Sequence, residues 1–116
     1  TLHYAETLEN DANQSFVSAY ENAYGELPDT YAVQGYDTGM MLVQALSVLG
    51  GDTSNQERLI DVLSNVHLAS PRGPLSFSDS HHPIQNVYLR EIRDGKHEVV
   101  RIAHENLEVP DEACQM

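Results

Sequence analysis

The segment Ser70-Pro71-Arg72-Gly73-Pro74 divides this sequence into two parts that must fold differently. Proline has no amide hydrogen to donate and restricts the residue before it, so this segment ends any helix that reaches it. Apolar residues recur at spacings of three and four before the segment, and β-branched residues become frequent after it. The sequence therefore predicts helices in the first part and strands in the second.

Three helices are predicted before the proline segment, and two of them have simple start and stop signals. The first begins at Asn10 or Asp11, whose side chains suit a helix cap, and ends at Gly25. The third begins at a capping box formed by Ser54 and Glu57.

The second predicted helix covers residues 31–49 and is the most apolar of the three. Asp29 or Thr30 is expected to cap it, and Gly50-Gly51 ends it. Its apolar residues lie on more than one face, as in helices that are buried on most sides. We therefore expect it to be the most buried helix and to need a partner that this chain scarcely supplies.

The strands are expected at the start of the chain and after the proline segment. Residues 2–5 and 75–77 are each predicted to form a short strand. Residues 87–92 and 98–103 are rich in β-branched side chains, and Asp94-Gly95 between them suits a turn with positive φ. These two segments are predicted to form a β-hairpin. A polar loop at 78–83 and a polar tail at 106–116 complete the pattern.

Composition and charge exclude several classes of function. The chain has 116 residues, and 6 Lys and Arg against 18 Asp and Glu give it a formal net charge of −12. Nucleic-acid binders need clustered basic residues, so no nucleic acid is expected as a partner. No apolar run approaches the roughly 18 residues that cross a bilayer. The first residues lack the pattern of a signal peptide, as expected of an internal start.

The sequence contains no motif for catalysis or for a metal. The serines lack a Gly-x-Ser-x-Gly context, so the chain is not expected to be an enzyme or to need a cofactor. His81 and His82 are adjacent on a loop and do not converge as ligands one helical turn apart would. His97 and His104 bring no known ligand spacing. The only cysteine, Cys114, is interpreted as an incidental surface thiol.

Four motifs occur in an order that is informative as a set. They are Phe16-Val-Ser-Ala-Tyr20 with Tyr24-Gly25 and Pro28-Asp29, Tyr31-Ala-Val-Gln-Gly-Tyr36-Asp37, the proline segment, and His82-Pro83-Ile-Gln85-Asn-Val-Tyr88-Leu-Arg-Glu91. With these motifs the sequence resembles the type I periplasmic binding proteins of the leucine/isoleucine/valine-binding class, which are substrate-binding proteins of ABC transporters. The resemblance extends from residue 1 to about residue 102.

The resemblance implies an α/β fold of two lobes, joined by three crossover segments, that close on a ligand. This chain would be its C-terminal third, with three helices followed by a short strand and a β-hairpin. Residues 1–75 would belong to the first lobe, residues 76–105 would return to the second lobe, and residues 106–116 would form a polar tail. Most of the groups that hold the ligand carboxylate would lie in the missing two thirds.

The resemblance also implies roles for single residues. Tyr31 opens the second helix, where the family places a bulky side chain against the ligand, although the pattern alone also fits a core tyrosine. Gln34 is the second candidate for ligand binding, with an exposed helix position as its alternative. Tyr36 is expected to pack between helix and sheet, and Asp37 to make a local hydrogen bond. Arg72 is expected to tie its loop to a neighbouring carboxylate.

The function that the resemblance implies is solute binding for an ABC importer, in the periplasm or outside the cell. The small-molecule ligand would be a branched-chain amino acid or a similar small carboxylate, and the protein partner an ABC permease. Two alternatives remain: a binding protein for aromatic carboxylates, or a ligand-sensing or interaction domain of a receptor. The isolated chain is expected to associate with itself through its second helix.

Overall fold

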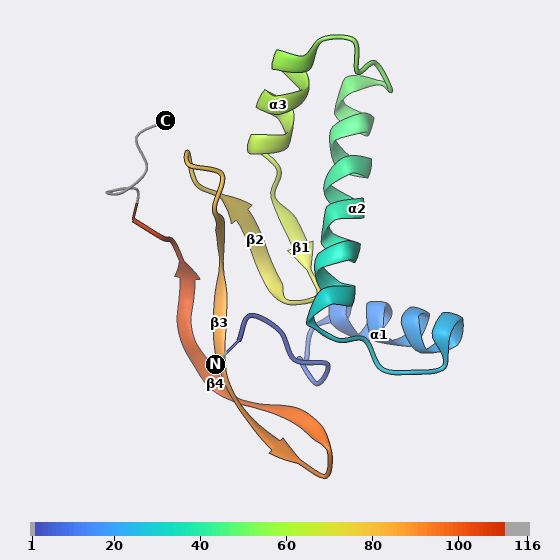
Figure 1. Ribbon diagram of the computed structural model, residues 1–116, viewed down its shortest axis with the longest axis vertical. Helices are drawn as coiled ribbons and strands as arrows, with labels where there is room; N and C mark the ends of the chain where they lie inside the picture. Colours follow the sequence, from blue (N-terminus) through green and yellow to red (C-terminus); the bar gives the residue numbers. More distant parts are fainter. Residues whose placement is uncertain (1, 111–116) are drawn as a thin grey trace.

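The computed structural model describes residues 2–110, and its elements follow the predicted order (Figure 1). Three helices come first: α1 (Asp11–Tyr24), α2 (Thr30–Leu49) and α3 (Gln56–Ser64). Four strands follow: β1 (Leu68–Ser70), β2 (Gly73–Phe77), β3 (Pro83–Arg93) and β4 (Lys96–Leu107). The predicted α/β class is confirmed. Cys114 and the end of the predicted tail lie outside the described residues.

Two of the three predicted helix starts are confirmed, and one is wrong. Asn10 caps α1 and Asp29 caps α2. For α3 the cap is Asn55, whose Oδ1 accepts a 3.0 Å hydrogen bond from the Arg58 amide, so the capping box at Ser54 does not form. Asparagine and serine both offer a side-chain oxygen to the free amides at the start of a helix. Here Asn55, one residue after Ser54, supplies that oxygen.

The strands form a single antiparallel sheet in the order β1-β2-β3-β4. Ser70 pairs with Gly73, so Pro71 and Arg72 form the turn between β1 and β2. The predicted hairpin is confirmed as β3 and β4, joined at Asp94-Gly95 with φ values of 48° and 78°. Positive φ at both positions is the signature of a type I′ turn. The hairpin is longer than predicted, and β4 includes residues 106 and 107 of the expected tail.

Residues 2–5 do not form the predicted strand. Leu2 makes one isolated antiparallel bridge to Tyr88 of β3, with backbone hydrogen bonds of 3.1 and 2.8 Å. The chain bends at His3, and Tyr4 then enters the core, where it is 1% exposed. A segment that leaves the sheet after one residue cannot continue the ladder of hydrogen bonds.

The molecule is flat, with extents of 49 × 37 × 19 Å, and its core is small. Tyr4, Phe16 and Val33 form the buried cluster, which lies where α1 meets the start of α2. In Figure 1, α3 lies beside the upper half of α2, and the β3–β4 hairpin extends away from the helices. As predicted, α2 has more buried residues than α1 or α3: Val33, Asp37, Ala45 and Leu49. Much of its apolar surface is nevertheless exposed, as expected of a helix whose partner this chain scarcely supplies: Tyr36, Met40, Leu42, Val43, Leu46 and Val48.

Candidate ligand-binding site

The start of α2 presents Tyr31 to solvent. Oδ1 of Asp29 accepts hydrogen bonds from the amides of Tyr31 and Ala32, at 2.9 and 2.8 Å, and so fixes the first turn of the helix. Tyr31 itself is 80% exposed. Within residues 2–110 it is therefore not a core residue, and its ring is free to contact a ligand.

Gln34, the second predicted ligand residue, is also exposed and contacts His3. Its Nε2 lies 3.3 Å from Nε2 of His3. Burial, followed by the charges of Arg72 and Arg90, lowers the pKa of His3 to about 4. His3 is therefore neutral at pH 7. Tyr31 and Gln34 are three residues apart, which places them on the same side of α2 as this imidazole.

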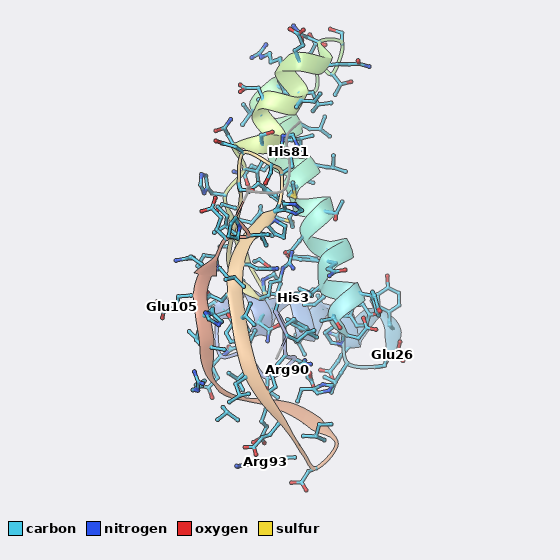
Figure 2. All side chains as sticks on the ribbon, turned by 60° about the vertical axis from the view of Figure 1, so that its left-hand side comes forward. His3, Glu26, His81, Arg90, Arg93 and Glu105 are labelled. Carbon is cyan, nitrogen blue, oxygen red and sulfur yellow. The ribbon has the colours of Figure 1, made fainter. Side chains whose placement is uncertain are left out.

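The segment that carries His3 is fastened to β3 and to α1. Arg90 Nη1 donates a 2.6 Å hydrogen bond to the carbonyl of Tyr4, and the Tyr4 hydroxyl donates to Asn13 Oδ1 at 3.0 Å. Figure 2 shows His3 and Arg90 close together, between β3 and the lower end of α2. One surface thus combines Tyr31 and Gln34 from α2 with His3 from the N-terminal segment.

Arg72 lies beside this surface and has the structural role predicted for it. Its Nε donates to Asp37 Oδ2 at 2.7 Å, and the Ser70 hydroxyl donates to the same oxygen at 2.9 Å. Burial raises the pKa of Asp37, and the Ser70 hydrogen bond and the Arg72 charge oppose that rise. The prediction of a local hydrogen bond for Asp37 is wrong, because both partners come from the segment around the β1–β2 turn.

Tyr36 does not pack between a helix and the sheet as predicted. Its ring lies 4.7 Å from the ring of Phe16, centroid to centroid, and the residue is 42% exposed. It therefore belongs to an aromatic contact between α1 and α2. Tyr20 and Tyr24 extend this row of rings along α1.

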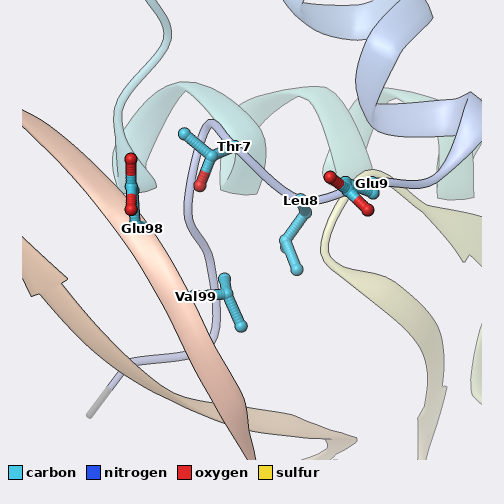
Figure 3. Close-up of a pocket in the computed structure, with 5 residues that line it drawn as sticks. All are labelled: Thr7, Leu8, Glu9, Glu98 and Val99. Atoms are coloured by element: carbon cyan, nitrogen blue, oxygen red, sulfur yellow. The ribbon is translucent and has the colours of Figure 1, made fainter.

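Two hollows lie along the N-terminal segment, and only the second is lined by an arginine. The first has a volume of about 490 Å³ and is lined by Thr7, Leu8, Glu9, Glu98 and Val99 (Figure 3). Its two carboxylates would repel an anion. The second, of about 370 Å³, is lined by Tyr4, Glu6, Leu27, Pro28, Asp29, Thr30, Arg90, Gly95 and His97. Neither Tyr31 nor Gln34 lines these hollows, so both residues lie on open surface.

The part of the chain that the structure describes contains no group of three or more His, Cys, Asp or Glu side chains suited to a metal. His97 contacts Glu6 instead, with its Nδ1 3.3 Å from Glu6 Oε2. Among the same residues no helix is long and apolar enough to cross a membrane.

Sequence reasoning missed His3 and Arg90 as neighbours of the candidate site. His3 lies 31 residues before Gln34, and Arg90 lies 86 residues after Tyr4. No spacing rule connects residues so far apart.

Known proteins match this chain along most of its length. The sequence profile of the family described as "Periplasmic binding protein" matches residues 1–96. A solute binding protein of an ABC transporter from R. palustris, solved in complex with benzoate, is 38% identical with a TM-score of 0.93. That alignment covers 99% of this chain and 32% of the other. A comparison with curated proteins gives no match.

Two further solved structures show the same relation at lower identity. A solute binding protein from Rhodopseudomonas palustris BisB5, in complex with 3,4-dihydroxy benzoic acid, is 28% identical with a TM-score of 0.80, over 93% of this chain and 31% of the other. A substrate-binding protein from Desulfitobacterium hafniense, in complex with Leu, is 25% identical with a TM-score of 0.72, over 84% and 29%. The chain thus spans about a third of these proteins. With its profile match and its 38% identical relative, the chain belongs to the type I periplasmic binding protein family.

Proposed function

We propose that this chain is part of a larger solute-binding protein, here called the parent protein, which delivers a small carboxylate to an ABC permease. The observation that carries the proposal is the exposed surface formed by Tyr31, Gln34 and His3 at the capped start of α2. A rigid helix end with an exposed aromatic ring and adjacent polar groups suits one wall of a binding cleft. Family membership supports the same reading.

Among small carboxylates, the proposed ligand is an aromatic acid, with branched-chain amino acids as the second candidate. The relative that is 38% identical was solved with benzoate, whereas the one solved with Leu is 25% identical. Tyr31 supports this order, because contact between its phenol ring and a ring of the ligand would stabilise the complex by more than the buried area alone accounts for.

The proposed mechanism is closure of two lobes around the ligand without covalent chemistry. Residues 1–75 would belong to the first lobe and residues 76–105 to the second, so the ligand would lie between segments of this chain and the rest of the parent protein. Closure needs only a higher affinity of the closed form for the ligand. In this proposal the protein is not an enzyme and acts in the periplasm or outside the cell.

Calorimetry with benzoate, 4-hydroxybenzoate and leucine tests the proposal on this chain and on the parent protein. We expect the parent protein to bind at least one aromatic acid, and this chain to bind it at least about tenfold more weakly, a loss of about 1.4 kcal/mol. Equal affinity in the two would contradict a shared site. A parent protein that binds none of the three would contradict the proposed function and favour the receptor-domain alternative.

A further inference from the structure

The backbone around His3 is held on both sides, so the point from which its side chain extends is defined. Leu2 pairs with Tyr88 through backbone hydrogen bonds of 3.1 and 2.8 Å. On the other side Tyr4 is 1% exposed, and its carbonyl accepts a 2.6 Å hydrogen bond from Arg90 Nη1. The ring also contacts Gln34, so together with the held backbone it loses less conformational freedom when a ligand binds, and its contacts contribute more fully to affinity.

Gln34 determines which nitrogen of His3 carries the proton. Nε2 of Gln34 is an amide nitrogen, which can only donate, and it lies 3.3 Å from Nε2 of His3. The imidazole Nε2 is therefore the acceptor, and the proton of the neutral ring is on Nδ1. Within residues 2–110 no group accepts a hydrogen bond from this Nδ1–H. His3 therefore offers one unused donor.

The surroundings of His3 favour an anion as the acceptor. Arg72 and Arg90 are the charged groups whose fields reach the imidazole, from the β1–β2 turn and from β3. Arg72 is paired with Asp37, whereas Arg90 forms no ion pair among the described residues. Glu6 and Asp29 line the same hollow as Arg90, but neither forms an ion pair with it among the described residues. A guanidinium without an ion pair, acting together with a neutral N–H donor, attracts a carboxylate and strengthens the hydrogen bond to it.

We propose that His3 contacts the ligand directly and donates a hydrogen bond from Nδ1 to the ligand carboxylate. This inference rests on the proposed function, since it assigns one contact within that site. Arg90 supplies the positive charge, and Gln34 positions the imidazole. Tyr31, on the same side of α2 as Gln34, then covers the apolar body of the acid. His3 thus adds a donor from this chain to the carboxylate-holding groups expected in the rest of the parent protein.

The test compares benzoate with benzamide in the parent protein and in its His3→Phe variant. Benzamide keeps the ring and replaces the carboxylate by a neutral amide, while phenylalanine keeps a planar ring and removes the donor. His3→Phe removes the proposed hydrogen bond to the charged carboxylate of benzoate. We therefore expect the benzoate affinity of the variant to fall about tenfold or more and its benzamide affinity to fall less. If leucine is the ligand found, leucinamide replaces benzamide in the same comparison.

His67→Phe is the matched control, because His67 is exposed on the connection between α3 and β1. It should leave both affinities unchanged. If the wild-type parent protein binds benzoate and His3→Phe binds it equally well, the role of His3 is overturned while the proposed function stands. Equal losses for benzoate and benzamide would also overturn the contact with the carboxylate. If the wild type binds no acid, both proposals fail.

A measurement on the wild type covers the case in which His3→Phe does not fold. Nitrogen-15 NMR distinguishes the two neutral tautomers of imidazole. We expect His3 in the Nδ1–H form, and addition of benzoate should shift its Nδ1 resonance. An Nε2–H tautomer, or an Nδ1 resonance that saturating benzoate leaves in place, would overturn the proposal.

Discussion

Tyr31 stands out at the scale of single residues because it is 80% exposed at the start of a firmly capped helix. We expect Tyr31→Ala in the parent protein to weaken binding of an aromatic acid about tenfold or more, since the contact area of the ring is lost. The melting temperature should change little, because surface substitutions usually alter stability by about 0.5 kcal/mol or less. Calorimetry and thermal melting measure the two effects.

The matched control for this prediction is Tyr24→Ala, since Tyr24 is 69% exposed at the end of α1. It should leave the affinity unchanged. A large fall in melting temperature for Tyr31→Ala, together with unchanged affinity, would instead show that Tyr31 belongs to the core of the parent protein.

The sequence predicted some of these residue roles and not others, and sequence distance explains the difference. The cap at Asp29 is a contact over two or three residues, which a local pattern contains. The sequence predicts that Arg72 pairs with a carboxylate, but it does not identify Asp37 as that carboxylate, because 35 residues separate the two. His3 and Gln34 belong to the same class of distant contact.

At the scale of elements, the pair of Asp37 and Arg72 fastens α2 to the turn between β1 and β2. Asp37 is 2% exposed and Arg72 is 8% exposed. We expect Arg72→Met in the parent protein to lower the free energy of unfolding by about 3–5 kcal/mol, because it leaves a buried carboxylate without its partner. Urea unfolding at pH 7 measures the loss.

An exposed ion pair provides the comparison for this prediction. The side chain of Arg93 is 62% exposed, and its Nη2 lies 2.5 Å from Glu91 Oε1. Arg93→Met should cost at most about 1 kcal/mol, the usual range for surface pairs. If both substitutions have the same small effect, Arg72 does not hold the turn in place.

The proline segment ends the helical part of the chain as predicted, but it also has a second role that the prediction does not include. It was predicted to end helix formation, and it also forms the turn of the β1–β2 hairpin. Gly73 has φ of 99°, and a Cβ at this position would lie 2.8 Å from the hydroxyl oxygen of Tyr88. That close approach exists only once β3 is in place. The local pattern therefore predicts the end of helix formation but not the β1–β2 hairpin. The turn at Asp94-Gly95 is predictable because these two residue types themselves favour positive φ.

At the scale of the whole molecule, the exposed apolar surface of α2 predicts that the isolated chain associates with itself. Val43 and Val48 are 60% and 61% exposed, and Leu42 is 47% exposed. Each square ångström of apolar surface removed from water contributes about 25 cal/mol, so burying a few hundred of them contributes several kcal/mol. We expect light scattering at micromolar concentration to detect dimers or larger species.

Salt and surface substitutions sharpen this prediction. The net charge of −12 makes copies of the chain repel each other, and salt screens that repulsion, so association should increase with ionic strength. A variant with Val43→Gln and Val48→Gln should associate less at every salt concentration. A compact monomer that melts cooperatively would show that the chain is a self-sufficient domain.

The contact between Tyr4 and Arg90 also has a consequence for the order of events on the ribosome. These residues are 86 apart, so at a few to about 20 residues per second the ribosome needs on the order of ten seconds to add Arg90 after Tyr4. Local helices such as α1 form far faster than that. The nascent chain therefore carries His3 on a segment that lacks its contacts with β3 until that strand leaves the exit tunnel. A translation product that stops before β3 lacks the strand that fixes His3 in position.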